Sequence, residues 1–430
     1  MVSDFTRRQF GAFTVGGAAA IATSQMGALA MEPKPFDPLS SAALFDDVKT
    51  YVNFGSHHTG LAADLAVSDW QARHLTQQGF NVTYSAVPVQ QHIASRSDLT
   101  LDNGQVIDVW AQWPQPKPSS TIEGALVDRT ENEATPIMAG DIAIVRVSGN
   151  TIDTEDNLGR ITPAFAAGAA AVIAVSTHES GLYQIGNVSE HMRPFAGPIV
   201  LAGKLDLVAI AAAKQGRIVI EGAFKQVAGQ SVTGRIDRGK KWIIVSTPQS
   251  GWTNCGGERG PGIALFRGLA NVLGSRANGP SLCFTSNSGH EFHNLGARLL
   301  HDAHGLPDPS DTALWVHLGA GFASRDWVVD EQGQFTFSDD HKGAIFMVTP
   351  QARDLVSADM AGLKAQIVST DEFNVGEMLA VTESGYDPAI GMVGYHSHHH
   401  IPGDREQTTS PRLLEGMARN TLKMIDQITL

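Results

Sequence analysis

The order of apolar and polar residues near the start of the chain predicts regular elements. From Leu61 to Leu75, apolar residues recur on one face at helical spacing, and Gly79 ends this pattern. The residues that follow, FNVTY at 80–84, alternate between apolar and polar positions as a half-buried strand does. Residues 42–84 therefore predict a helix, a loop, a longer helix and a strand.

A different composition begins near Pro88 and continues to Gln226. This stretch contains many short segments rich in valine and isoleucine, such as IAIVRV at 142–147. An alanine- and glycine-rich segment predicts one helix over 162–170, which leads into a strand over 171–175. Many strands with few helices predict a β-rich inserted domain over residues 88–226.

From Lys241 onward, apolar strand segments alternate with helical segments. We expect strands at 242–246, 281–285 and 313–317, and helices at 261–274, 293–304 and 411–428. This alternation is typical of a mostly parallel sheet that helices cover on both faces. The sequence therefore predicts an α/β fold, formed by residues 31–87 and 227–430, with the β-rich domain inserted between them.

The first thirty residues predict export. TRRQF at 6–10 precedes an uncharged stretch rich in glycine and alanine, and ALA at 28–30 is typical of a cleavage site. Together these features indicate a twin-arginine signal, with a disordered tail as the alternative, and they predict a periplasmic or secreted protein. No later segment contains eighteen consecutive apolar residues, so we expect no membrane-spanning helix.

The composition of the chain limits the classes of partner that we expect it to bind. The chain has 430 residues, and 42% of them are apolar, which is enough apolar material for a large core. Its net charge is −13. The acidic balance argues against nucleic acid and anionic membranes as partners. Two cysteines, Cys255 and Cys283, are too few for a disulfide scaffold, and we expect them to be buried thiols rather than one disulfide.

Polar clusters follow the predicted strands of the α/β domain, where ligands bind in parallel sheets. They comprise TPQS at 247–250, Glu258-Arg259, His290-Glu291, His317, and YHSHHH at 395–400. Histidine and carboxylate are ligands that zinc prefers, and a catalytic zinc keeps one position open for water. A solvated loop remains an alternative for the histidine run. For His293 and His317, capping or core roles are alternatives to metal or substrate binding.

The order of elements resembles the co-catalytic zinc aminopeptidase and glutamate carboxypeptidase family over nearly the whole chain after residue 30. YVNFGSHHTG at 51–60 resembles that family's N-terminal loop, and HIPGD at 400–404 resembles the end of its last zinc-ligand loop. GDIAIVR at 140–146 and AAGAAAVI at 166–173 are similar to its protease-associated insertion. The resemblance implies the family's α/β fold with such an insertion.

The resemblance also implies a changed metal site. The family binds two zinc ions through His, a bridging Asp, Glu, Asp and His, and a Glu that precedes the ligand Glu acts as base. In this chain Thr247-Pro248-Gln249 replaces the first His-x-Asp, and Glu258 stands in the bridging position. His290 replaces the base, His317 falls on the next Asp, and Glu291 and His400 are retained. Losing the first histidine disfavours one of the two metals.

The resulting hypothesis is an exported enzyme with one zinc ion rather than two. Its metal ligands would be Glu291, His317 and His400 with Glu258 nearby, and His290 would be the general acid or base. Candidate substrate-binding residues are Gln249, Arg259, His293 and His398. The enzyme would hydrolyse an amide or ester in a small peptide or acyl compound. A zinc-dependent lyase or isomerase, and a catalytically inactive binding protein, remain alternatives, and a homo-oligomer is expected by analogy only.

Overall fold

The computed structural model describes residues 36–189, 193–303, 305–329, 335–338, 343–356 and 365–429. The described residues from Asp37 onward belong to one compact unit. The predicted export signal lies outside the described residues, so it stays a prediction. No described helix combines the length and the apolar character that crossing a bilayer requires. Cys255 and Cys283 are both buried and free, which confirms the expectation of two thiols.

Four parallel strands form the centre of the α/β domain, as the alternation of elements predicts. They are β9 (Trp242–Pro248), β10 (Ser281–Asn287), β11 (Thr312–Leu318) and β16 (Ala389–Gly394), in the spatial order β16-β11-β9-β10. Beyond β16, β14 (Ala344–Val348) pairs antiparallel, and β15 (Ala365–Ser369) is parallel to β14. A separate antiparallel pair consists of β12 (Asp326–Val329) and β13 (Phe335–Ser338).

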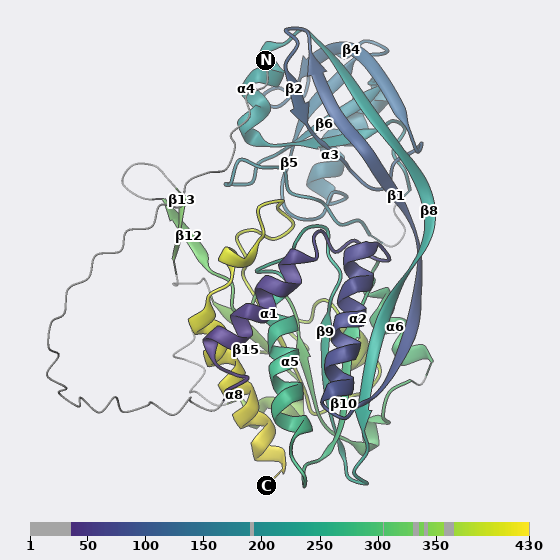
Figure 1. Ribbon diagram of the computed structural model, residues 1–430. Helices are drawn as coiled ribbons and strands as arrows, with labels where there is room; N and C mark the ends of the chain where they lie inside the picture. The colour runs from purple at the N-terminus through teal and green to yellow at the C-terminus, as the bar shows by residue number, and fades with distance from the viewer. Residues whose placement is uncertain are drawn as a thin grey trace, which may run out of the picture. The chain divides into compact units, whose positions relative to one another are not determined.

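Helices cover both faces of this sheet (Figure 1). Along β9, Ile243 and Val245 join one apolar cluster and Ile244 joins another, because successive side chains point to opposite faces. The first cluster includes residues of α1 (Ser41–Asn53), α2 (Ala62–Gln77), α5 (Gly260–Gly274) and α8 (Pro411–Thr429). The second includes α7 (Met378–Glu383), and α6 (Leu295–Asp302) contacts α7. The sheet is therefore buried on both sides.

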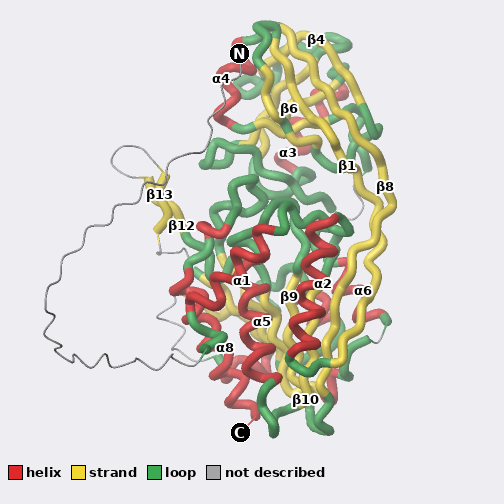
Figure 2. Tube along the Cα trace, viewed as in Figure 1, coloured by secondary structure: helices red, strands yellow, loops and turns green. Residues whose placement is uncertain are grey.

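Two long strands connect the α/β domain to the inserted region, and they are visible in Figure 2 as a continuous ladder. β1 (Asn81–Leu101) pairs antiparallel with β8 (Gln215–Ile236), which also pairs antiparallel with β10. The expected boundaries, Pro88 and Gln226, lie inside these strands, and Gln226 pairs with Gln90. The insertion is thus a continuation of the same sheet.

The inserted region is rich in strands and has apolar clusters of its own. Its strands are β2 (Val106–Asp108), β3 (Trp110–Ala111), β4 (Ser120–Asp128), β5 (Ile142–Val147), β6 (Ala171–Ser176) and β7 (Ile199–Ala202). Its helices are α3 (Glu155–Ala166) and α4 (Leu207–Ala212). A short 3₁₀ turn lies in this region at Lys204–Asp206, and others lie in the α/β domain at Pro309–Asp311, Pro350–Leu355 and Glu406–Thr408.

Two predicted helices have different bounds in the structure. The helix expected over 162–170 is α3, Glu155–Ala166, because Thr154 caps its N-terminus by accepting a hydrogen bond from the Asn157 amide. Gly168, with φ of +109°, follows its end. The helix expected from residue 293 begins at Leu295, since His293 and Asn294 both adopt left-handed φ values of +59°. The predicted bounds of the other helices hold within one or two residues.

Candidate metal and proton-transfer site

The site lies where the four parallel strands end. The loops after β9, β10 and β11 carry Glu258, His290 and Gly319, and the loop after β16 carries the histidine run. Because these strands are neighbours in the sheet, their carboxyl ends meet at one edge. The expected position of the site is therefore the position at which these polar loops come together.

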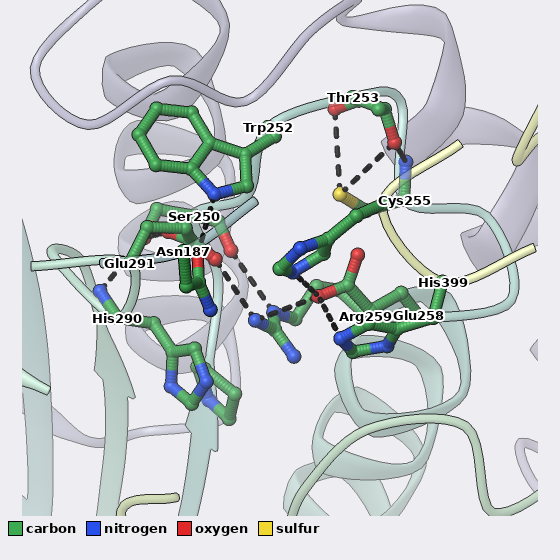
Figure 3. Close-up of polar contacts among 12 residues, drawn as sticks. Asn187, Ser250, Trp252, Thr253, Cys255, Glu258, Arg259, His290, Glu291 and His399 are labelled. Atoms are coloured by element: carbon green, nitrogen blue, oxygen red, sulfur yellow. Dashed lines mark hydrogen bonds and ion pairs between the residues drawn. The ribbon is translucent and has the colours of Figure 1, made fainter. Parts of the chain in front are cut away.

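Arg259 occupies the centre of the polar cluster (Figure 3). Its side chain is 1% exposed, and its Nη2 lies 2.9 Å from Oε1 of Glu258 and 2.9 Å from Oε1 of Glu291. Its Nε donates to the Ser250 carbonyl oxygen at 3.0 Å. The Ser250 hydroxyl donates to Oε2 of Glu291 at 2.9 Å, so Glu291 is engaged through both carboxylate oxygens.

Electrostatics favour the charged forms of Glu258 and Arg259. Burial alone would raise the pKa of Glu258, but Arg259 and the neighbouring histidines outweigh it and hold that pKa well below its usual range. Burial likewise opposes the charge of Arg259, yet Glu258 and Glu291 raise its pKa. One guanidinium is therefore shared by two buried carboxylates, and its removal would leave both of them without a compensating charge.

Two histidines converge on the same carboxylate. His400 Nε2 lies 3.4 Å and His399 Nε2 3.9 Å from Oε1 of Glu258. Nδ1 of His400 is 2.9 Å from the Ile185 carbonyl oxygen, which can only accept, so Nδ1 carries the proton and donates it. If the ring is neutral, Nε2 is left as the lone-pair nitrogen that faces Glu258. This is the arrangement that orients metal-ligating histidines.

Backbone contacts hold Glu258 beside the histidine loop. The carboxylate of Asp404 accepts hydrogen bonds from the amides of Gly257 and Glu258, at 2.7 and 3.1 Å. Asp404 also lies 3.0 Å from Nε2 of His396. Both oxygens of Glu258 are buried without a hydrogen-bond partner, apart from the ion pair with Arg259. Among the described residues, Glu258, His399 and His400 form the group whose ligand atoms lie within 4.8 Å of one another. They are therefore a candidate group for holding a metal ion.

His290 forms a second centre beside Arg259 and its two carboxylates. Its Nδ1 lies 3.4 Å from Oε1 of Glu377, whose other oxygen accepts from Asn287 Nδ2 at 2.8 Å. Burial, followed by the charge of Arg259, lowers the pKa of His290 to about 3, although 18% of its side chain is exposed. His290 is therefore neutral at pH 7, and a proton held on Nδ1 by Glu377 would leave Nε2 as a base.

A cavity of about 580 Å³ lies beside His290 and Arg259 and reaches His399 of the candidate metal group. Polar members of its lining include Arg259, His290, Glu291, His317 and His399, and its apolar wall includes Ile345, Phe373, Val375 and Val393. His317 is held by a 2.9 Å hydrogen bond between its Nδ1 and Ser246 Oγ, and burial lowers its pKa to about 4. The cavity thus combines a neutral base, a buried cation and an apolar wall.

The structure brings together only part of the expected ligand set. Glu258 and His400 meet, but His399 completes their group, whereas Glu291 pairs with Arg259 and His317 bonds to Ser246. Arg259 and His293 line the cavity, and their role in binding substrate stays a prediction. Sequence reasoning did not identify Glu377. The helix that follows it, α7, lies in a stretch for which the sequence pattern predicted no elements.

Two expected substrate-binding residues lie elsewhere. Gln249 is completely buried, and its amide nitrogen donates to Asp64 Oδ1 and Ser68 Oγ, at 2.9 and 2.7 Å. Its amide oxygen accepts from Ser286, so Gln249 joins α2 to the sheet instead of facing a substrate. His398 does not line the cavity, and its ring packs 5.4 Å from that of Phe337.

Backbone strain concentrates at this edge of the sheet. The described non-glycine residues with left-handed φ are Cys255, His293, Asn294 and His400, with φ between +50° and +61°. Each lies in a loop that carries the site. Such conformations cost about 1 kcal/mol per residue and persist where the surroundings enforce them. The left-handed backbone of His400 sets the direction in which its ring approaches Glu258.

Solved structures share this architecture. A zinc aminopeptidase from Bacillus subtilis superposes with a TM-score of 0.69 at 15% identity, covering 92% of this chain and 96% of its own. This chain has the zinc aminopeptidase fold. An M28 peptidase precursor from Shewanella amazonensis SB2B matches with a TM-score of 0.67 at 13% identity, covering 91% and 94%. An aminopeptidase from Aneurinibacillus sp. strain AM-1 matches with a TM-score of 0.60 at 15% identity, also covering 91% and 94%.

Comparison of the sequence alone finds no relative. No family model matches the chain, and no curated protein sequence matches it either. At 13–15% identity, the structural likeness establishes the fold.

Proposed function

We propose that this protein is a hydrolase with one divalent metal ion, zinc by the chemistry of its ligands, held by Glu258, His399 and His400. The observation that carries the proposal is the convergence of two imidazole Nε2 atoms on a buried carboxylate. Two histidines and one glutamate are a known catalytic zinc set, which leaves a position for water. The zinc aminopeptidase from Bacillus subtilis, which has the same fold, supports the choice of metal.

The chain's own residues divide the work around that ion. Zinc, when bound, would supply a Lewis acid for a carbonyl or a bound water. His290, neutral and oriented by Glu377, takes the proton from the attacking water and returns it to the leaving group. Nη1 of Arg259 is buried without a hydrogen-bond partner, so it can donate to a substrate oxygen. The apolar wall then receives the apolar part of a small peptide or acyl substrate.

The first test is the zinc content of the purified chain, measured by atomic emission, beside His399→Ala and His400→Ala. We expect about one zinc per wild-type chain, with loss in both variants. His398→Ala is the matched control, because it changes a histidine of the same loop outside the ligand group, and it should retain the metal. Wild-type protein without zinc would overturn the proposal and favour a binding protein. Two zinc ions per chain would contradict a single-metal centre.

A substrate screen follows from the same assignment. The screen should contain amides and esters of small peptides and acyl groups, and compounds with an acidic proton beside a carbonyl. Turnover of the second class alone would identify a lyase or isomerase that uses the same His290 base. We further propose that the protein acts outside the cytoplasm after twin-arginine export, as residues 6–10 indicate.

A further inference from the structure

Arg259 is built into the site more firmly than a substrate-binding arginine needs to be. It is the N-cap residue of α5, and its side chain is almost completely buried. Three of its contacts are with groups that are themselves fixed: the Ser250 carbonyl oxygen and one oxygen each of Glu258 and Glu291. Because Ser250 also donates to Glu291, the guanidinium is locked in a closed ring of interactions.

The position of the guanidinium matters as much as its rigidity. A single nitrogen, Nη2, lies 2.9 Å from an oxygen of each carboxylate. Glu258 is also the carboxylate on which His399 and His400 converge. The positive charge of Arg259 therefore lies beside the single-metal group, between two carboxylates that could otherwise share a second cation.

Charge counting gives the consequence. Two carboxylates and one guanidinium sum to −1, and one divalent ion makes the buried group +1. A second divalent ion would raise it to +3 without any further anion from these three side chains. Like charges at such short range repel strongly where water is excluded. One metal ion is compatible with Arg259, and two are not.

We propose that Arg259 is a built-in cation that takes the place of a second metal ion and limits this site to one. The inference rests on the proposed single-metal function, since it explains why that function uses one ion. Removing the guanidinium should leave Glu258 and Glu291 facing each other with room for a metal. The Arg259→Ala variant should then bind one more zinc ion than the wild type.

The experiment compares zinc per chain, by atomic emission after dialysis against buffered zinc, in the full-length exported protein and three variants. Arg259→Ala should gain about one ion. Arg259→Lys should not, because the ammonium keeps a positive charge between the carboxylates. Arg267→Ala is the matched control: Arg267 is another buried arginine of α5, paired with Asp47 at 2.9 Å, and its loss should leave zinc content unchanged.

A fourth variant locates the added ion. Arg259→Ala combined with Glu291→Gln lacks one of the two proposed carboxylates, so it should not gain zinc. The proposal is overturned if Arg259→Ala binds no more zinc than wild type, if Arg259→Lys gains an ion, or if the double variant still gains one.

The result tests this inference separately from the proposed function, because it compares the zinc content of Arg259→Ala with that of the wild type. Wild type without zinc would reject the single-metal function, yet a gain on Arg259→Ala would still support Arg259 as the excluding cation. If Arg259→Ala folds only when zinc is present, zinc-dependent recovery of its melting transition supports the inference. If zinc fails to recover it, the carboxylates do not form a metal site and the inference fails.

Discussion

Individual side chains in this site are defined by the charge that burial allows them to keep. Arg259 stays charged because two carboxylates hold it, whereas burial and that same charge keep His290 neutral. Two neighbouring residues at the same sheet edge therefore have opposite electrostatic roles. A guanidinium that keeps its charge is suited to binding an oxygen, and a neutral imidazole offers a nitrogen lone pair to a proton donor.

Replacing His290 with Gln should lower kcat by about 10²- to 10⁴-fold, the usual contribution of a general base, without changing zinc content. The variant keeps a polar side chain but has no group that can take a proton near pH 7. Turnover of whichever substrate the screen identifies is the measurement. His398→Gln is the control, because His398 is a loop residue that does not line the cavity, and this variant should retain activity. Equal losses in both variants would contradict the role of His290.

At the scale of elements, polar contacts of Arg267 join helices α1, α2 and α5 in addition to their apolar packing. Arg267 of α5 pairs with Asp47 of α1 and lies 3.7 Å from the ring of Trp70 in α2. Nε2 of His74 in α2 donates a hydrogen bond to the Arg267 carbonyl oxygen at 3.0 Å, because a carbonyl oxygen can only accept. Burial, followed by the charge of Arg267, lowers the pKa of His74 to about 4.

His74 should therefore make stability depend on pH. The folded-state pKa of about 4 lies below the unfolded value near 6.5, so the unfolded chain binds more protons between these values. The free energy of unfolding should fall by up to about 1.4 kcal/mol per pH unit on acidification through this window. In His74→Gln that part of the fall should be absent. Urea unfolding at pH 7.5 and pH 5 measures it, and an unchanged difference between the two pH values would contradict it.

On the scale of the whole molecule, the inserted region takes part in the site. Its Ile185 carbonyl oxygen accepts from His400, and its Gln184 donates to the His399 carbonyl oxygen at 2.9 Å. Asn187 accepts from the indole of Trp252 and lines the cavity. Because β1 and β8 extend through both regions, the insertion is held by a continuous ladder of backbone hydrogen bonds. The geometry of the proposed metal ligands therefore depends on both parts of the fold.

Export through the twin-arginine pathway is a prediction about the whole protein. Changing Arg7 and Arg8 to Lys preserves the charge of the leader but removes the arginine pair that receptors of this pathway read. In a bacterial host with a twin-arginine pathway, we expect the double variant to stay in the cytoplasm while wild type reaches the periplasm. Immunoblots of cell fractions measure this, and equal export of both chains would argue against this type of signal.

Local patterns predicted most of the α/β fold correctly. The strands at 242–246, 281–285 and 313–317 and the helices at 261–274 and 411–428 are present, because their apolar periodicity reflects burial. The helix over 162–170 was wrongly placed because its cap, Thr154, lies outside the alanine-rich segment. The hydrogen bonds of Gln249 could not be predicted, because its partners, Asp64, Ser68 and Ser286, are distant in sequence.

By itself, the sequence determined the alternation of strands and helices in the α/β domain and the sheet edge at which the polar loops follow the strands. These depend on periodicity and composition, which are local properties. Only the tertiary structure decided that Arg259 lies between Glu258 and Glu291, that His399 joins His400, and that Glu377 supports His290. These contacts join loops from different strands, and their distances and charge balance exist only after the sheet has brought the loops together.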